Sequence, residues 1–437
     1  MFRTISNFLK VKDIRQKIIF TLLMLVIFRI GTHIPVPFTN SDVLKQIFET
    51  GPEDTTQNVF GFLNTFGGGA LQNFSILAMG IMPYITASII MQLLQMDVVP
   101  TFTEWKSQGE MGRKKLAQVT RYGTIVLAFV QGIAMSIGFN AMAGGELIVN
   151  SNITTLLMIA LVLTAGTAFL MWLGEQITAN GVGNGISIII FGGIVAGVPS
   201  GANQLFGHYF ANPGDELFIN IVIVLLIILV ILAVIVGVIY IQQAERKIPI
   251  QYAKTLVNRS PVGGHSTHLP LKVNAAGVIP VIFAIAFIIA PQTIAGFFEG
   301  NSFAATIQSI FDYTKPIGMV LYVALIIAFT YFYTFVQVNP EQMAENLQKQ
   351  GGYVPGIRPG HNTETYLTRV LYRLTFVGSI FLAAVSVLPI LLGGLANLPS
   401  AVQIGGTSLL IVVGVALQTM KQLEGQLVQR HYKGFIK

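Results

Sequence analysis

The chain has few charged side chains and no cysteine. Asp, Glu, Lys and Arg make up only 10% of its 437 residues, whereas soluble domains carry about 25%. Apolar residues account for 53%, and the mean hydropathy is +0.68. So few charges cannot cover the surface of a soluble chain of this length, which excludes an ordinary cytosolic protein. The lack of cysteine excludes a disulfide scaffold, an iron–sulfur site and a thiol nucleophile.

The sequence also lacks the common catalytic and nucleotide-binding motifs. It contains no His-Glu-x-x-His, no Walker loop and no Gly-x-Ser-x-Gly. His265 and His268 are close in sequence, but no acidic or thiol ligand lies beside them, so a solvated loop is favoured over a metal site. Gly181–Gly185 opens an apolar helix without a preceding strand, which indicates close packing. We therefore predict no catalytic residue, no metal site, no cofactor and no enzymatic activity.

Long apolar segments dominate the sequence instead. A helix needs about 20 apolar residues to cross a bilayer, and the apolar runs predict an all-α membrane protein with ten transmembrane helices. Arg29 lies near the end of the first span, where a long basic side chain can reach the interface. The predicted spans are 18–35, 74–96, 117–139, 153–173, 183–203, 217–241, 273–293, 315–338, 370–391 and 405–420.

The basic residues predict the orientation of these helices. If the N-terminus is cytoplasmic, 23 of the 26 lysine and arginine residues fall in cytoplasmic segments, as the positive-inside rule requires. No small-residue cleavage site follows the first span, so the basic stretch 1–17 is predicted to be retained. Both termini, including the tail 421–437, are then cytoplasmic. So are two long loops, 242–272 and 339–369.

Two motifs recur five helices apart. Gly80–Ile85 and Gly277–Ile282 both read Gly-x-x-Pro-x-Ile, and Gly185–Ile190 and Gly406–Ile411 both read Gly-x-Ser followed by three aliphatic residues. Five is an odd number, so the second half would enter the membrane from the opposite side, as in an inverted repeat. Chance similarity among Gly- and Ile-rich helices is the alternative. The predicted halves are 18–203 and 217–420.

One charge-free stretch is too polar to be a simple span. Residues 55–96 carry no charge, but Phe60–Leu71 is rich in Gly and Asn. Irregular backbone at membrane depth must be buried in protein, because lipid cannot bond its polar groups. We therefore interpret Phe60–Leu71 as a re-entrant segment, with an external surface loop as the alternative.

The two long loops carry basic residues that suit an anionic partner. Loops of about 30 residues exceed what helix connection needs and are often functional. Arg358 lies between Pro355-Gly356 and Pro359-Gly360, which restrict the loop and present one guanidinium. Ribosomal RNA or an acidic protein surface would fit such charges, although they could merely fix topology and bind anionic lipids. The candidate residues are Arg246, Lys247, Lys254, Arg259 and Arg358.

Several longer motifs are spread along the sequence. They are Ser75–Leu94, Gly183–Ser187, His268–Asn274, Gly277–Pro280, Asn339–Glu341, Val354–Gly360 and Gly405–Ser408. Together these motifs resemble the SecY family, the channel subunit of the bacterial protein translocase. The resemblance covers nearly the whole chain, and the motifs occur in the family's order.

The resemblance implies two five-helix halves around an hourglass-shaped pore. It also implies a lateral gate, with spans two and three on one side and spans seven and eight on the other. It implies a plug formed by the re-entrant segment, with candidate residues Phe60, Asn64, Phe66, Gly67, Gly68, Gly69 and Leu71. It also implies a pore ring of aliphatic side chains. These match Ile81, Ile85, Ile186, Ile190, Ile279 and Ile411, and the internal repeat adds Ile282.

The resemblance further implies the partners and the location. The expected partners are the small membrane subunits SecE and SecG, the SecA ATPase, the ribosome, signal peptides and nascent chains; anionic lipids are a further expectation from the basic loops. The expected location is the bacterial cell (inner) membrane. The expected function is a conduit for unfolded polypeptides that releases transmembrane segments sideways into lipid. Because the chain has no nucleotide motif, the energy must come from outside.

A secondary transporter of a small solute, built on an inverted repeat, is the alternative. Such a transporter needs a polar or charged site near the bilayer midplane. The corresponding positions in this chain are isoleucines, which bind no particular solute and favour the conduit.

Overall fold

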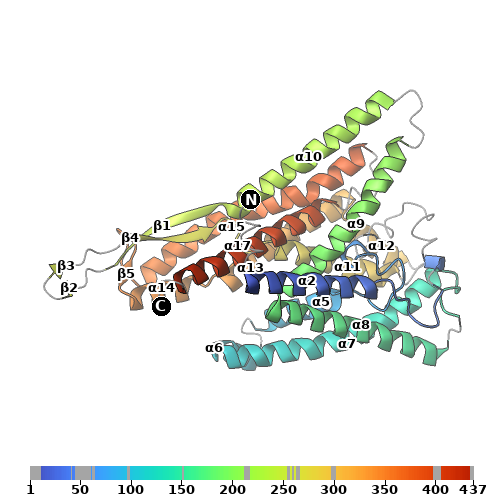
Figure 1. Ribbon diagram of the computed structural model, residues 1–437, viewed down its shortest axis with the longest axis horizontal. Coiled ribbons are helices and arrows are strands. Elements are labelled where there is room, and N and C mark those ends of the chain that lie inside the picture. The colour runs from blue at the N-terminus through green and yellow to red at the C-terminus, as the bar shows by residue number, and fades with distance from the viewer. Residues whose placement is uncertain are drawn as a thin grey trace.

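The computed structural model describes residues 11–40, 42–44, 61, 64–95, 99–149, 152–210, 217–252, 256–257, 260–261, 266–296, 302–396 and 405–433. Figure 1 shows an elongated bundle of long helices, with a small group of strands projecting at one end. Helices α2, α7 and α8 lie together on one side, and α10, α15 and α17 lie together on the other.

Each of the ten predicted spans overlaps one helix of the structure. These helices are α2 (Lys12–Gly31), α5 (Met82–Leu94), α7 (Glu110–Met142), α8 (Ile153–Asn180), α9 (Gly185–Phe210), α10 (Leu217–Gln243), α11 (Ile279–Gly296), α13 (Pro316–Gln337), α15 (His361–Ala396) and α17 (Gly405–Lys433). Three shorter helices connect them: α6 (Pro100–Ser107), α12 (Ser302–Phe311) and α14 (Pro340–Lys349).

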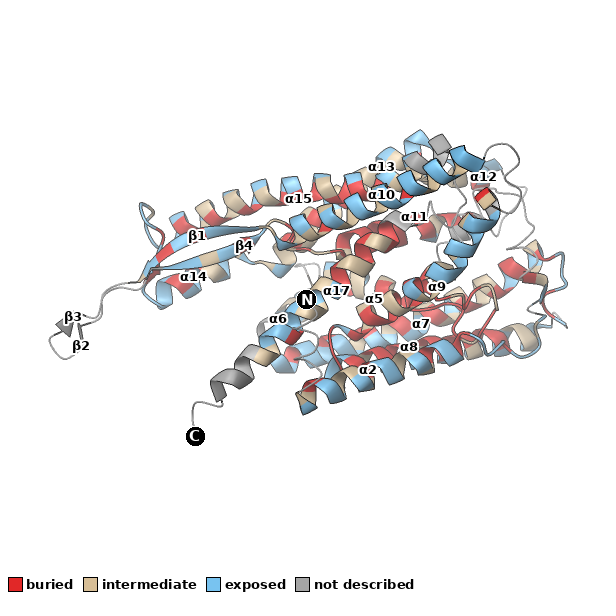
Figure 2. Cartoon of the chain, turned by 45° about the horizontal axis from the view of Figure 1, so that its top comes forward, coloured by how far each residue is buried: buried red, intermediate tan, exposed pale blue. Residues whose placement is uncertain are grey.

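Six of the described helices are long and apolar enough to cross a membrane: α7, α8, α9, α10, α13 and α15. Helices α5 and α11 are shorter, and α2 and α17 carry more charged or polar residues. Helix α10 is the most apolar of the six, and only 11% of its apolar window is buried. Figure 2 shows α10 largely pale blue along its length. A wholly apolar helix exposed in this way is suited to contact with lipid.

The predicted starts of two spans were wrong. Helix α5 begins at Met82 rather than at residue 74, and α11 begins at Ile279 rather than at 273. The cause is a glycine with positive φ two residues before each helix, Gly80 at 57° and Gly277 at 67°. A left-handed residue interrupts a right-handed helix, and the proline that follows is favoured in the first helical turn.

These two turns are equivalent in the predicted repeat. In each half, the positive-φ glycine is followed two residues later by the helix start and three residues later by a proline. Matching backbone at matching positions adds structural support to the repeat that the sequence motifs suggested.

The two long loops contain a sheet that the sequence analysis did not predict. Strands β1 (Glu245–Tyr252) and β4 (Ser266–Lys272) pair antiparallel, and β5 (Gly352–Tyr353) pairs with the other edge of β1. A small hairpin, β2 (Leu256–Val257) with β3 (Ser260–Pro261), lies at the far end. Ile248 and Ile250 of β1 point inward, and the sheet shares a core with α14 and α15. We call β1, β4, β5, α14 and the start of α15 the sheet subdomain.

Glycine allows α8 to approach the chain that leads into α5. A Cβ built on Gly166 would lie 1.8 Å from the carbonyl oxygen of Ile76, which is backbone and cannot turn aside. Gly166→Ala is therefore expected to destabilise the fold by about 3 kcal/mol, the upper end of overpacking costs. The midpoint of heat-induced unfolding in detergent measures this.

Gly123→Ala is the matched control, because its Cβ would meet only the Ala87 Cβ at 4.0 Å. Alanine favours a helix over glycine, so the midpoint should stay the same or rise. Equal midpoints for the two variants would contradict the close approach of α8.

Candidate functional site

The seven isoleucines of the predicted ring come from four helices and meet in one apolar cluster. They lie at or near the starts of α5, α9, α11 and α17. Ile81, Ile85, Ile190, Ile282 and Ile411 are buried in the largest core of the structure, and Ile186 and Ile279 are half-buried against it. We call this core the central cluster. Other residues of the cluster are equally buried, so burial does not distinguish a pore lining from packing, and the ring stays a prediction.

The described part of the re-entrant segment folds into a short helix at Asn64–Phe66 followed by tight turns. Phe60 lies outside the described residues. The Asn64 side chain accepts a hydrogen bond from the Gln72 amide at 2.9 Å, and its carbonyl accepts one from Gly69 at 2.8 Å. Gly68 and Gly69 have φ of 66° and 85°, which only glycine adopts readily.

This segment is buried, as a re-entrant segment should be and an external loop would not be. Phe66 is 6% exposed and packs in the central cluster. Leu71 is fully buried in a second core with α7 and α8. Its side chains thus join two cores.

A glycine of α9 forms the surface on which the segment rests. A Cβ on Gly193 would lie 2.6 Å from the carbonyl oxygen of Phe66 and 3.1 Å from the amide nitrogen of Gly68. Backbone therefore packs on backbone at this point. Gly193 thus gives α9 a flat packing surface for the segment.

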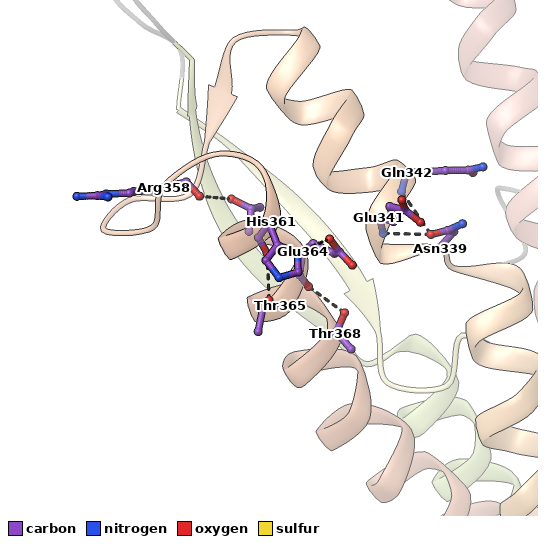
Figure 3. Close-up of polar contacts among 9 residues, drawn as sticks. Asn339, Glu341, Gln342, Arg358, His361, Glu364, Thr365 and Thr368 are labelled. Carbon is purple, nitrogen blue, oxygen red and sulfur yellow. Dashed lines mark hydrogen bonds and ion pairs between the residues drawn. The ribbon is translucent and has the colours of Figure 1, made fainter.

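The loop around Arg358 is constrained as its prolines and glycines predicted. Gly356 and Gly360 have φ of 82° and 98°. The Ile357 amide donates to the Val354 carbonyl at 3.0 Å, and the buried Thr363 hydroxyl donates to the Arg358 carbonyl at 3.0 Å. Figure 3 shows the Arg358 side chain pointing away from α15, and the residue is exposed. A rigid loop thus presents a free guanidinium.

The two helices that flank the loop, α14 and α15, each have a side-chain hydrogen bond or ion pair at their first turn. The Asn339 side chain accepts hydrogen bonds from the amides of Glu341 at 3.0 Å and Gln342 at 3.3 Å, which caps α14. At the start of α15, His361 Nδ1 lies 3.0 Å from Glu364 Oε2. The Asn339–Glu341 motif therefore forms the N-terminal cap of α14.

The remaining predicted cations divide into two groups. Arg246 and Lys247 are exposed on β1. Lys254 and Arg259 lie outside the described residues.

The two long loops are joined to each other by a strand pairing. Strand β5 pairs with β1 at Gln251↔Tyr353, and the Tyr353 hydroxyl donates to Gln251 Oε1 at 3.1 Å. The loops 242–272 and 339–369, which the sequence analysis treated separately, therefore form one unit. No local sequence pattern predicts the pairing of β1 with β5.

The comparisons with known proteins decide the family. The SecY family model matches residues 75–420. The chain is 68% identical to the protein translocase subunit SecY of Bacillus licheniformis and 66% identical to that of Bacillus subtilis, in both cases over 100% of either chain. The chain belongs to the SecY family.

Solved structures show the same fold. A SecY structure whose plug domain is described as stabilising the closed state superposes with a TM-score of 0.60 at 20% identity, covering 95% of this chain and 92% of that one. Sec61 in a canine ribosome-channel complex gives 0.59 at 18% identity, covering 95% and 93%. The ten-helix fold is thereby confirmed.

Membership in this family settles the broad function. The chain is a protein-conducting translocation channel and a multi-pass protein of the bacterial cell membrane. The transporter alternative is not favoured.

Proposed function

We propose that unfolded polypeptides pass through a constriction formed by the seven isoleucines of the central cluster, between the halves 18–203 and 217–420. The observation that supports this is their convergence from four helices, two of which, α5 and α11, start at repeat-related turns. An aliphatic ring fits loosely around any side chain and excludes water when empty. It offers no group for solute recognition or for enzymatic chemistry, so the channel works as a passive conduit.

The re-entrant segment acts as the plug of this constriction. Its Phe66 packs in the same cluster as the ring, and its backbone rests on α9. The plug domain of a related SecY is described as maintaining a membrane seal, which agrees with this role.

Partners supply the energy and complete the assembly. The sheet subdomain faces the cytoplasm, as do both termini, and it docks the SecA ATPase or the ribosome through Arg358, Arg246, Lys247, Lys254 and Arg259. The Sec61 relative was solved in a ribosome-channel complex, which supports a ribosome contact. SecE, SecG and lipid cover the exposed apolar faces, and anionic lipid headgroups bind the basic loops. Signal peptides and transmembrane segments leave sideways through a lateral gate. One side of this gate is formed by α5 and α7, and the other side by α11 and α13.

The ring is tested by replacing three of its apolar side chains with polar ones. Serine at Ile81, Ile190 and Ile411 should wet the constriction, because a dry gate depends on apolar walls. Resting ion conductance in planar bilayers should rise, and transport of preproteins with defective signal sequences should improve. Leucine at the same positions should change little.

Ile159→Ser is the matched control for the ring. Ile159 is 1% exposed in α8, so serine there should cost about 2–5 kcal/mol of stability without opening the pore. If the triple-serine channel keeps a low resting conductance and still rejects preproteins with defective signal sequences, the isoleucines serve only as packing residues and the ring proposal is contradicted.

The plug is tested by removing the residues before Leu71, so that the second core, in which Leu71 packs, stays intact. Replacing Asn64–Ala70 by a short Gly-Ser linker keeps Leu71, which is fully buried. Resting conductance should rise while preprotein transport into vesicles largely survives, because a seal is needed only when the pore is empty. An unchanged resting conductance would contradict a sealing role.

Arg358 is tested by exchanging its forked donor. Arg358→Lys keeps the charge but loses bidentate hydrogen bonding, so docking should weaken roughly tenfold, the value of one bond to a charged group. Arg358→Glu should nearly abolish partner-dependent transport. Binding of SecA or ribosomes to reconstituted channel measures both effects.

Lys349→Glu is the matched control, since Lys349 is an exposed cation on α14 that pairs with Glu345 at 2.8 Å. It should leave docking nearly unchanged. Normal transport by the Arg358→Glu channel at equal abundance would remove Arg358 from the docking site.

A further inference from the structure

Arg29 makes a contact that its place in an apolar helix did not predict. It lies in the last turn of α2, where the sequence analysis assigned it to the membrane interface. In the structure, its Nη1 donates a hydrogen bond to the backbone carbonyl of Gly68, in the middle of the re-entrant segment. The two residues are 39 positions apart in sequence, so the bond joins two separate elements.

Gly68 is held on three sides at this point. A Cβ on Gly68 would lie 3.2 Å from the Gly193 Cα of α9 and 3.4 Å from the ring of Phe28, the neighbour of Arg29 in α2. Gly68 also has positive φ. Its carbonyl belongs to a left-handed turn and accepts the bond from Arg29, a charged donor. Hydrogen bonds from charged donors are about twice as strong as neutral ones.

The last turn of α2 makes further contacts with the chain that follows the segment. The Asn73 amide side chain donates to the Thr32 carbonyl at 3.3 Å, and the backbone amide of Ile76 donates to the Ile34 carbonyl at 3.0 Å. These contacts lie C-terminal to Leu71 and hold that part of the chain against the end of α2. Arg29 of α2, in contrast, hydrogen-bonds Gly68, which lies in the part that must move.

We infer that Arg29 is a positioning residue for the plug: its bond to the Gly68 carbonyl holds the re-entrant segment on α9 in the closed channel. The inference rests on the proposed function of that segment as a plug. Opening requires the bond to break, after which the guanidinium is free to reach lipid headgroups or water. The contact is one bond, so it biases the closed state without locking it.

A cysteine at Ala70 reports the position of the segment. Ala70 is fully buried, and the chain has no other cysteine. When the segment closes faster than the thiol reacts, the labelling rate with a soluble maleimide is proportional to the displaced fraction. The measurement is made on the full channel in vesicles, without a preprotein.

Arg29→Gln in the Ala70→Cys channel should raise the labelling rate roughly tenfold, the value of one hydrogen bond from a charged group. Arg29→Lys retains a charge and a donor and should give a smaller rise. Arg121→Gln is the matched control, because Arg121 of α7 is also an arginine that bonds across two elements, but its partner is Glu175 of α8 at 2.7 Å and not the segment. It should leave the rate unchanged.

A second reporter separates a displaced segment from a loosened fold. Ala284 of α11 is fully buried, so Ala284→Cys should label equally slowly with and without the Arg29→Gln substitution. An unchanged rate at Ala70, or an equal rise at both reporters, would overturn the inference.

Conductance distinguishes this inference from the plug proposal itself. In the channel whose Asn64–Ala70 is replaced by a linker, Arg29→Gln should add no further leak. If that channel does not leak but labelling of Ala70→Cys still rises, the sealing role fails and the Arg29 contact stands. If the linker channel leaks but Arg29→Gln does not change the labelling of Ala70→Cys, the sealing role stands and the inference about Arg29 fails.

Discussion

The structure depends on burying a stretch of irregular backbone at membrane depth. Between α2 and α5 the chain is not a continuous helix, so its amides and carbonyls need partners that lipid cannot provide. Asn64 bonds the Gln72 amide, Ile34 bonds the Ile76 amide, and Arg29 bonds the Gly68 carbonyl. Glycines at 166 and 193 bring two helices close enough to cover the rest. The proposed plug role agrees with such a segment, because a regular spanning helix could not leave its place at low cost.

The same constraint bears on two residues of the proposed ring, which lie where α5 and α11 begin. Gly80 and Gly277 each end a stretch of turns, and α5 and α11 start immediately after them. Ile81 and Ile279 therefore sit at the boundary between irregular and helical backbone in both halves. An inverted repeat brings the two boundaries toward the same interface, which places aliphatic side chains there without any need for polar recognition.

The sequence was sufficient for the features that depend on composition and short motifs. Apolar runs predicted all ten helices, and Pro and Gly around Arg358 predicted a restricted loop. The helix starts at Met82 and Ile279 were missed, because one left-handed glycine outweighs an apolar run. The pairing of β5 with β1 was missed because Gln251 and Tyr353 are far apart in sequence. Thr363 and Arg29 were missed as contacts for a related reason: each acts through a backbone carbonyl, which leaves no pattern in the sequence.

The sheet subdomain is joined to the central cluster by a short and well-bonded connection. Strand β4 ends at Lys272, and the Val273 amide then donates to the Ala244 carbonyl at 3.0 Å. The Asn274 side chain donates to the Gly277 carbonyl at 3.0 Å, and α11 begins two residues later. A Cβ on Gly378 of α15 would lie 2.8 Å from the Val273 carbonyl oxygen, so α15 packs directly on this turn. A long unbonded loop would absorb the motion of a docked partner. Here, β5, β1 and β4 are paired in one sheet, and the bonded turn joins that sheet to the helix that carries Ile279 and Ile282 with no unbonded loop between them.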